Sequence, residues 1–336
     1  MRFKLFVAIA AISILFVFPS LVGQAGPADN SADQVRIVLL HFNDSHGQTA
    51  GIDMDGMKRG GYPRLAGMVR RERQQPGPDG VFLIHAGDEF SRGDRLTQRT
   101  AGAANVDLLN HIGVDLMTPG NGEFYIGLVK LTERMNQADF PFLAANVRNR
   151  LTGEPIAKPY VIRQVGGVKI AFFGLTFVRA EHPSLIGLEM LDPVETAGEL
   201  VPLLRKQADV VVAVTHLGMA DDIKLAGAVD GIDVIIGGHS HTVLDQGYQT
   251  LSPSGKGVLI AQAGEFMKFL GRVELKLKRV DGSWRLVDSS ARLMPVDQDT
   301  QADELTRQFL DSLNARPARP ARGVSRPAES LVPAED

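Results

Sequence analysis

The sequence predicts a layered α/β protein. Short runs of β-branched and other apolar residues alternate with amphipathic segments along most of the chain, and this alternation is typical of helices packed against a sheet. The 336 residues are 44% hydrophobic, which is enough for a substantial core. No internal repeat is visible, so residues 33–300 are interpreted as one domain.

The first half of the body alternates strictly between the two element types. Apolar spacing predicts helices at Tyr62–Arg73, Ala103–His111 and Leu128–Gln137. Short apolar runs predict strands at Val35–Phe42, Val81–Ala86, Asp115–Thr118 and Phe140–Asn146.

The second half begins with a predicted hairpin, in which two strands flank Gly166-Gly167. Its strands are Tyr160–Val165 and Val168–Leu175, and a helix follows at Val194–Gln207. Two apolar runs predict inner strands at Val210–Val214 and Val234–Ile236. Three further runs predict antiparallel strands, with Asp281-Gly282 as the tight turn between the last two; they are Val258–Gln262, Phe269–Leu277 and Trp284–Asp288. The segment 301–314 predicts a terminal helix over Ala302–Leu313.

Residues 1–25 have the pattern of a secretory signal peptide. Arg2 and Lys4 precede an apolar run from Leu5 to Phe18, and Gly23-Gln24-Ala25 suits cleavage after Ala25. We expect the mature protein to be exported, to the periplasm or the extracellular space, without a stable membrane anchor. A retained N-terminal anchor is the alternative.

Residues 315–336 are rich in Pro, Ala and Arg and poor in large apolar side chains, which predicts a disordered tail. The alternative is a basic arm that docks on a partner or a membrane. The chain contains no cysteine, so any metal must bind to His, Asp, Asn or water. With a formal net charge of −3 and no basic cluster in the body, nucleic acid is not a predicted partner.

Polar residues collect where the predicted strands end. Asp44 and His46 follow the first strand and point the same way, because alternate residues of an extended chain share a face. Metal-type ligands also follow four later strands, in Gly87-Asp88, Gly120-Asn121-Gly122-Glu123, Thr215-His216 and Gly237-Gly238-His239-Ser240-His241. The carboxyl ends of strands in open α/β sheets meet at one crevice, so we expect these side chains to converge.

Each of these motifs has a simpler interpretation when taken alone. A Gly-Asp pair is usually a turn, and Asn between two glycines usually takes a left-handed turn position. The set is different, because ordered His, Asp and Asn at five strand ends would leave polar groups unpaired unless they bind a ligand.

In order, the five motifs resemble those of the calcineurin-like metallophosphoesterases. The catalytic domain of the secreted 5′-nucleotidase and 2′,3′-cyclic-nucleotide phosphodiesterase family is the most similar branch. The resemblance covers roughly residues 35–280, including Gln262-Ala263-Gly264-Glu265-Phe266. It implies a four-layer α/β/β/α sandwich with two mixed sheets and two divalent metal ions at the strand ends.

The resemblance also assigns ligands to the two ions, with Asp88 as the bridge between them. One ion would lie on Asp44, His46, Asp88 and His241, and the other on Asp88, Asn121, His216 and His239. Two ions about 3.5–4 Å apart can hold a bridging hydroxide for in-line attack on phosphorus. Nitrogen and oxygen ligands without sulfur suit Mn, Zn, Fe or Co.

The sequence departs from the family pattern at two places. Gly122 and Tyr125 replace a His, which stabilises charge on the phosphoryl group or leaving oxygen, and an Asp, which orients that His. The catalytic residue is therefore unassigned, and the spare candidates are His85, His111, His182 and Tyr125. The C-terminal domain that stacks the nucleobase in two-domain nucleotidases is also not expected, so base selectivity should be weak or supplied by a partner protein.

Three functions are consistent with these observations. The leading hypothesis is an exported dinuclear hydrolase of small anionic phosphate esters, including nucleotides. The first alternative is a thiosulfohydrolase-like enzyme that acts on a sulfur oxyanion held by a carrier protein. The second is a metal-binding module with little or no turnover, because of Gly122.

Overall fold

The computed structural model describes residues 33–90, 92–177 and 182–316. The predicted signal peptide and almost all of the predicted tail lie outside these residues. Within the described ranges, no helix is long and apolar enough to cross a membrane.

The first of two large sheets is mixed and has the strand order β15-β14-β1-β4-β5. The strand β1 is parallel to β4 and antiparallel to β14, and β14 and β15 form a long antiparallel pair. The bounds are β1 (Gln34–Phe42), β4 (Gly80–His85), β5 (Leu116–Met117), β14 (Phe269–Val280) and β15 (Ser283–Pro295).

The second sheet is also mixed, in the order β12-β13-β11-β10-β8-β7. Its parallel centre is flanked by the antiparallel neighbours β7 and β12. The bounds are β7 (Tyr160–Val165), β8 (Val168–Thr176), β10 (Val210–His216), β11 (Val234–Ile236), β12 (Tyr248–Leu251) and β13 (Gly257–Ala261).

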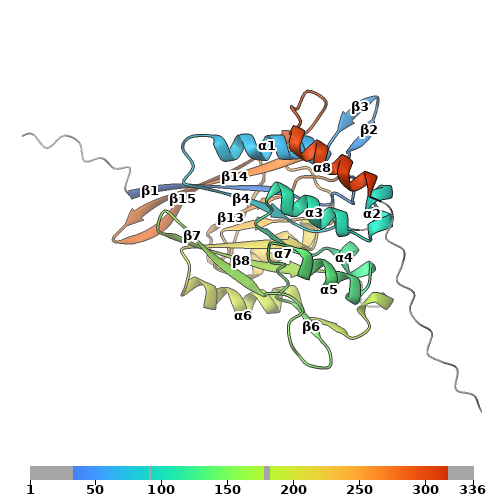
Figure 1. Cartoon of the computed structure of the whole chain (residues 1–336). Helices are drawn as coiled ribbons and strands as arrows, with labels where there is room; N and C mark the ends of the chain where they lie inside the picture. The colour runs from blue at the N-terminus through green and yellow to red at the C-terminus, as the bar shows by residue number, and fades with distance from the viewer. Residues whose placement is uncertain (1–32, 91, 178–181, 317–336) are drawn as a thin grey trace, which may run out of the picture.

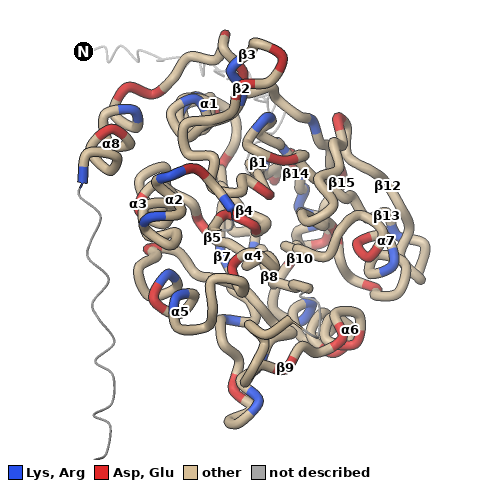
Figure 2. Tube along the Cα trace, turned by 90° about the vertical axis from the view of Figure 1, so that its right-hand side faces the viewer, with Lys and Arg blue, Asp and Glu red and all other residues tan. Residues whose placement is uncertain are grey.

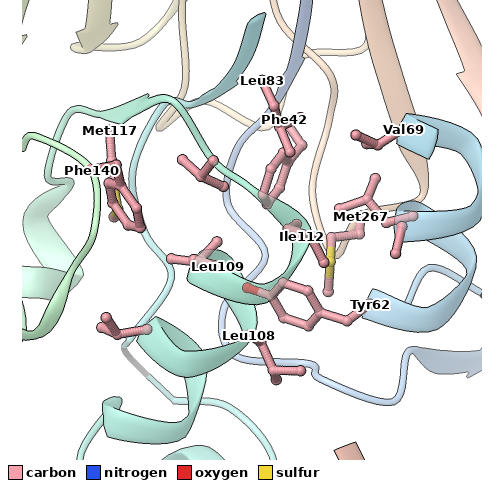
Figure 3. Packing of buried hydrophobic residues seen from close by; sticks show 14 of the residues in the cluster. Phe42, Tyr62, Val69, Leu83, Leu108, Leu109, Ile112, Met117, Phe140 and Met267 are labelled. Atoms are coloured by element: carbon pink, nitrogen blue, oxygen red, sulfur yellow. The ribbon is translucent and has the colours of Figure 1, made fainter. Parts of the chain in front are cut away.

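The two sheets pack face to face, with helices on the outer faces. On β1, Ile37 and Leu39 point into the core between the sheets, whereas Leu40 and Phe42 point into the core beneath the helices. This second core includes Tyr62 and is drawn in Figure 3. Figure 1 shows α1, α3 and α8 on one side and α6 on the other. The predicted layered fold with two mixed sheets is confirmed.

The helices and the smaller ribbons complete the layers. The helices are α1 (Tyr62–Gln74), α2 (Arg95–Thr100), α3 (Ala103–Ile112), α4 (Asn121–Tyr125), α5 (Leu128–Gln137), α6 (Pro193–Arg205), α7 (Met219–Ala228) and α8 (Glu304–Ala315), with a 3₁₀ turn η2 (Pro183–Leu185). Two short ribbons are formed by β2 (Ile52–Met54) with β3 (Met57–Arg59) and by β6 (Val147–Asn149) with β9 (Leu188–Met190).

The terminal helix α8 is part of the same packed body. Leu310 and Leu313 are buried in the core beneath α1 and α3. Asp303 caps the helix by accepting from Thr306 N at 2.8 Å, and it forms an ion pair with Arg70 of α1. Figure 2 shows acidic and basic residues along α8.

Two strand predictions are wrong. Phe140–Asn146 is not a strand, because Phe142 forms a bridge with Met117 and Leu143 with Lys158, so no ladder continues along one partner. The strand β13 does not join Phe269–Leu277 in an antiparallel meander. It lies parallel to β11 in the other sheet, because side chains on both of its faces are buried, as an inner strand requires.

Several short elements were not predicted. The helices α2 and α4 are only six and five residues long, too short to show a helical period. In α7 the buried face includes Asp222, which obscures the apolar pattern. The β2, β3, β6, β9 and β12 strands have three or four residues each.

Candidate metal centre

The seven predicted ligands lie at the carboxyl ends of strands from both sheets. Asp44 and His46 follow β1, and Asp88 follows β4. The remaining four come from the start of α4, the end of β10 and the loop after β11; they are Asn121, His216, His239 and His241. The packing of the two sheets therefore brings together residues that lie far apart in the sequence.

Close contacts join these side chains into one cluster. His46 Nε2 lies 3.0 Å from His241 Nε2, which is 3.3 Å from Asp44 Oδ1. Asp88 contacts both ends of the cluster, with Oδ2 at 3.8 Å from His46 Nδ1 and Oδ1 at 3.4 Å from His216 Nε2.

The remaining two predicted ligands pair with each other. His239 Nδ1 lies 2.8 Å from Asn121 Oδ1, and the His239 ring is 5.2 Å from that of His216. Two sets have donor atoms that all lie within 4.8 Å of one another: Asp44, His46 and His241, and Asp44, Asp88 and His216. Asp44 is thus common to both sets, whereas the resemblance names Asp88 as the bridge.

Unpaired buried atoms show that these residues fit metal ions. Asp44 Oδ1, His46 Nδ1 and His216 Nε2 are buried and have no hydrogen-bond partner among the described residues. Such unpaired groups are rare in proteins because desolvation is costly without a partner. A cation bound between them would satisfy a carboxylate oxygen and two imidazole lone pairs together.

Neighbouring groups orient the ligand atoms. Asp44 Oδ2 accepts from Asn43 Nδ2 at 2.7 Å and from His239 N at 2.8 Å, which leaves Oδ1 directed into the cluster. His216 Nδ1 lies 2.7 Å from the Ala86 carbonyl oxygen. Nδ1 must therefore carry the proton, because a carbonyl only accepts, and the Nε2 lone pair faces Asp88.

The backbone is strained at five of the seven positions. Asp44, His46, Asp88, His239 and His241 all have φ between +47° and +75°, a left-handed region that favours glycine. Each such residue costs of order 1 kcal/mol or more and persists where the surroundings hold it. Here Asp44 N donates to Gly87 O and His46 N to Asp88 O, at 2.8 and 2.9 Å.

Glycines are required where the ligand loops touch. A Cβ on Gly120 would lie 2.3 Å from Asp88 Oδ1, and one on Gly87 would lie 2.6 Å from His216 Nδ1. Neither position has room for a larger residue, so the glycines in the motifs set how closely Asp88 and His216 approach.

The charges within the cluster favour the charged forms of Asp44 and His216. Burial tends to raise the pKa of Asp44, but the nearby His241 imidazole, whose Nε2 lies 3.3 Å from Oδ1, and the charge of His216 outweigh it and lower the pKa to about 2. Burial tends to lower the pKa of His216, but the carboxylates of Asp88 and Asp44 raise it overall. Asp44 is therefore a carboxylate, the form that binds a cation, throughout the physiological range.

Glu123 holds two of the ligand loops together. Its carboxylate accepts from four backbone N–H groups, those of Asp88, Glu89, Phe90 and Gly120, at 2.6–2.8 Å. The sequence places Glu123 within a motif but indicates no role for it, because three of these four partners lie in the distant loop after β4.

Glu89 is a second residue that sequence reasoning missed. It is fully buried, and it bonds to His85 Nε2 at 3.1 Å, Asn105 Nδ2 at 2.6 Å and the Ser45 hydroxyl. The network ties Ser45, the residue after Asp44, to Glu89, the residue after Asp88. A Glu directly after a Gly-Asp turn was the only available signal.

The candidates for the side chain that is missing at Gly122 lie in different environments. His85 is a buried member of the Glu89 network, and His111 stacks on Phe309 of α8 with ring centroids 4.6 Å apart. Both therefore have packing or hydrogen-bonding roles. His182 lies against Tyr125 of α4, with ring centroids 4.1 Å apart.

The chain is similar to several known proteins. It is 29% identical to the metallophosphoesterase YunD of Bacillus subtilis (strain 168) over 282 residues, which cover 82% of this chain and 57% of YunD. It is 30% identical to the trifunctional nucleotide phosphoesterase protein YfkN of the same organism over 314 residues, which cover 82% of this chain and 20% of YfkN.

Among solved structures, a 5′-nucleotidase precursor from Thermus thermophilus superimposes with a TM-score of 0.74 at 27% identity. The match covers 83% of this chain and 58% of that one. The chain thus spans less than two thirds of the length of each of these three proteins. A family model described as calcineurin-like phosphoesterase matches residues 37–243, which is more than half of the chain. This protein belongs to the calcineurin-like phosphoesterase family.

Proposed function

We propose that this protein is a dinuclear metal-dependent hydrolase of small phosphate esters, nucleotides among them. One observation carries the proposal: seven metal-type side chains lie together, and three of their buried donor atoms lack a partner within the described part of the chain. Membership of the phosphoesterase family and likeness to proteins named as nucleotidases support the reaction class.

The proposed ligand sets are those implied by the motifs. One ion would be held by Asp44, His46, Asp88 and His241, and the other by Asp88, Asn121, His216 and His239. Bound divalent ions would supply positive charge for the phosphoryl oxygens and would activate a water molecule as nucleophile. The residues around the site hold the metal-ligating side chains in place. They thereby determine which oxygen of the ester lies against which ligand or hydrogen-bond donor.

Asp88 is held in its orientation by hydrogen bonds from α4. Gly122 N donates to Asp88 Oδ1 at 2.6 Å, and Glu123 accepts from Asp88 N at 2.8 Å. The side chain and the backbone of Asp88 are thus both held by α4, so the carboxylate needs little rearrangement to bind an ion.

Gly122 limits the expected rate. It contributes only its backbone N–H, which is directed to Asp88, so position 122 has no side chain to stabilise the leaving oxygen. Loss of one preorganised donor typically lowers turnover by ~10²–10³. We therefore expect measurable but slow turnover unless another side chain serves as the donor.

The test uses purified full-length protein loaded separately with Mn²⁺, Zn²⁺ and Co²⁺. Metal content per chain is measured, and hydrolysis is followed on phosphate monoesters, phosphate diesters and a thiosulfonate carried on a peptide. Asp88→Asn is the control that weakens metal binding without a change in side-chain volume. Fewer than one equivalent of metal in the wild type would refute the site.

The same panel separates the other two functions. Turnover of the carried thiosulfonate alone would replace the phosphoesterase proposal with the thiosulfohydrolase-like alternative. A wild type that binds two metal equivalents but hydrolyses nothing would favour the metal-binding module. In that case a Gly122→His variant that gains hydrolysis would show that position 122 is the reason.

We also propose that the protein acts after export. The supporting observation is the basic start and apolar run of residues 1–25, with Gly23-Gln24-Ala25 before the cleavage point. The mass of the protein recovered from an expressing cell is the test. A mass that begins at residue 26 supports export, whereas an intact N-terminus in the cytoplasm contradicts it.

A further inference from the structure

The imidazole of His182 lies beside α4, the helix in which Gly122 stands where the family pattern has a histidine. Asn121, Gly122 and Tyr125 all belong to α4. Residues four apart in a helix are neighbours on its surface, so Tyr125 lies next to Asn121. Asn121 Oδ1 is 2.8 Å from His239 Nδ1, which ties this face of α4 to the metal centre. The ring of His182 lies on the ring of Tyr125, with centroids 4.1 Å apart.

A separate contact places Phe177 on the same side of the centre. Phe177, directly after β8, lies edge-on against the His239 ring at a centroid distance of 6.2 Å. Five residues further on, His182 contacts Tyr125. Phe177 thus contacts His239, and His182 contacts Tyr125 on the helix that carries Asn121. Phe177 and His182 are five residues apart, so their Cα atoms lie at most about 17 Å from each other.

The hydrogen bonds of His182 decide which ring nitrogen is the donor. Nδ1 accepts from Ser184 N at 3.2 Å and lies 2.7 Å from Ser184 Oγ. A nitrogen that accepts from a backbone N–H carries no proton, so the proton of the neutral ring is on Nε2. The ring is held by Tyr125 on its face and by Ser184 at Nδ1, and Nε2–H is the group left to meet a ligand.

We propose that His182 supplies the hydrogen-bond donor that Gly122 lacks. This inference rests on the phosphoesterase function proposed above. In the reaction, the attacking hydroxide forms a new P–O bond while the P–O bond to the leaving group breaks. His182 donates Nε2–H to the departing oxygen as its negative charge develops, and that oxygen then takes a proton from water. Tyr125, at the position of the family's orienting Asp, acts as a positioning residue by holding the ring.

His182 also has a structural role, and the variants are chosen to separate that role from hydrogen-bond donation. His182 also caps the short turn η2, because Nδ1 accepts from Ser184 N. Asn is among the best capping residues, so His182→Asn keeps an acceptor for Ser184 while it removes the ring and its Nε2 donor. His182→Ala removes the acceptor as well. Ile186→Ala changes an exposed side chain directly after η2 and serves as the control for a change near His182.

The experiment compares two phosphate monoesters on the metal-loaded full chain. An aryl ester such as 4-nitrophenyl phosphate has a leaving oxygen that needs little stabilisation, whereas an alkyl ester such as glycerol phosphate needs much. We expect His182→Asn and His182→Ala each to lower kcat on the alkyl ester by ~10²–10³, and on the aryl ester by less than about tenfold. Ile186→Ala should retain activity within a few-fold on both.

Metal content, measured for every variant, shows whether the centre stays intact. Wild-type activity on His182→Asn would overturn the inference and leave a capping role. Equal losses on both esters would also overturn it, because damage to folding or metal binding has no leaving-group dependence. A wild type that is inert on both esters would refute the proposed function itself, whereas active wild type with insensitive variants refutes only the role of His182.

Discussion

Gly120→Ala tests the metal centre through a single methyl group. The added Cβ would lie 2.3 Å from Asp88 Oδ1, 2.6 Å from Asp88 N and 2.7 Å from His216 Cε1. Ordinary contacts of a Cβ lie beyond about 3.4 Å, so at least one predicted ligand must move by about 1 Å. Gly120 has φ −88°, which Ala adopts without strain, so the effect is steric.

The neighbours of Gly120 cannot yield easily. Glu123 accepts from both Asp88 N and Gly120 N, at 2.8 and 2.6 Å, so the two loops are held at a set separation. Overpacking of this kind typically costs ~1–3 kcal/mol of stability. Displacement of supporting contacts around a metal typically lowers affinity by ~10–100-fold. We therefore expect both losses in the same variant.

The assay combines calorimetric titration with Mn²⁺ or Zn²⁺ and urea unfolding followed by the fluorescence of Trp284, the single tryptophan. Gly198→Ala is the matched control, because Gly198 lies in α6 with no atom within 4 Å of the added Cβ. The control should gain about 0.5–1 kcal/mol and bind metal normally. Metal affinity and an unfolding midpoint at wild-type values in Gly120→Ala would refute the reasoning.

Three further predictions concern stability. Burial raises the pKa of Asp222 from 3.8 to about 7, although Thr215 Oγ donates to it at 2.6 Å. The folded state thus holds a proton that the unfolded state releases, so stability falls as pH rises from about 4 to 7, by up to roughly 4 kcal/mol. Asp222→Asn should remove this fall, giving a gain over wild type at pH 8 and none at pH 4 in urea titrations; equal differences at both pH values would contradict it. Glu123→Gln leaves one acceptor oxygen for four N–H groups and should cost about 2–6 kcal/mol, seen as a lower unfolding midpoint of the metal-free protein. Asp303→Ala removes the α8 cap and the partner of Arg70 and should cost about 1–2 kcal/mol, whereas an unchanged midpoint would show that α8 contributes nothing through this contact.

Local signals predicted the long elements well. The run before Asp44 is apolar at every position from Val38 to Leu40, and β1 is buried on both faces in the structure. Such a run must be an inner strand, because no other extended segment can bury consecutive side chains on opposite faces. The glycine pair after Val165 likewise predicted the β7–β8 hairpin, since both glycines have positive φ.

The failures arose where a distant contact decides the structure. Phe140–Asn146 is as apolar as a strand, yet Phe142 and Leu143 pair with different segments. The short helix α4 begins at Asn121 because Glu123 accepts from Gly120 N and from the loop after β4. No periodicity within five residues can report such a contact.

By itself, the sequence determined which residue types stand at the strand ends and that none of them is cysteine, and so it determined the kind of ligand the protein can bind. Only the tertiary structure decided how these residues meet. In the folded chain Asp44 lies close to His46, His216 and His241. The helix α4 holds both the side chain and the backbone of Asp88. His182 packs against Tyr125. The reason is physical: residue chemistry is local, whereas the geometry of a site depends on contacts between loops that only the packing of two sheets brings into register.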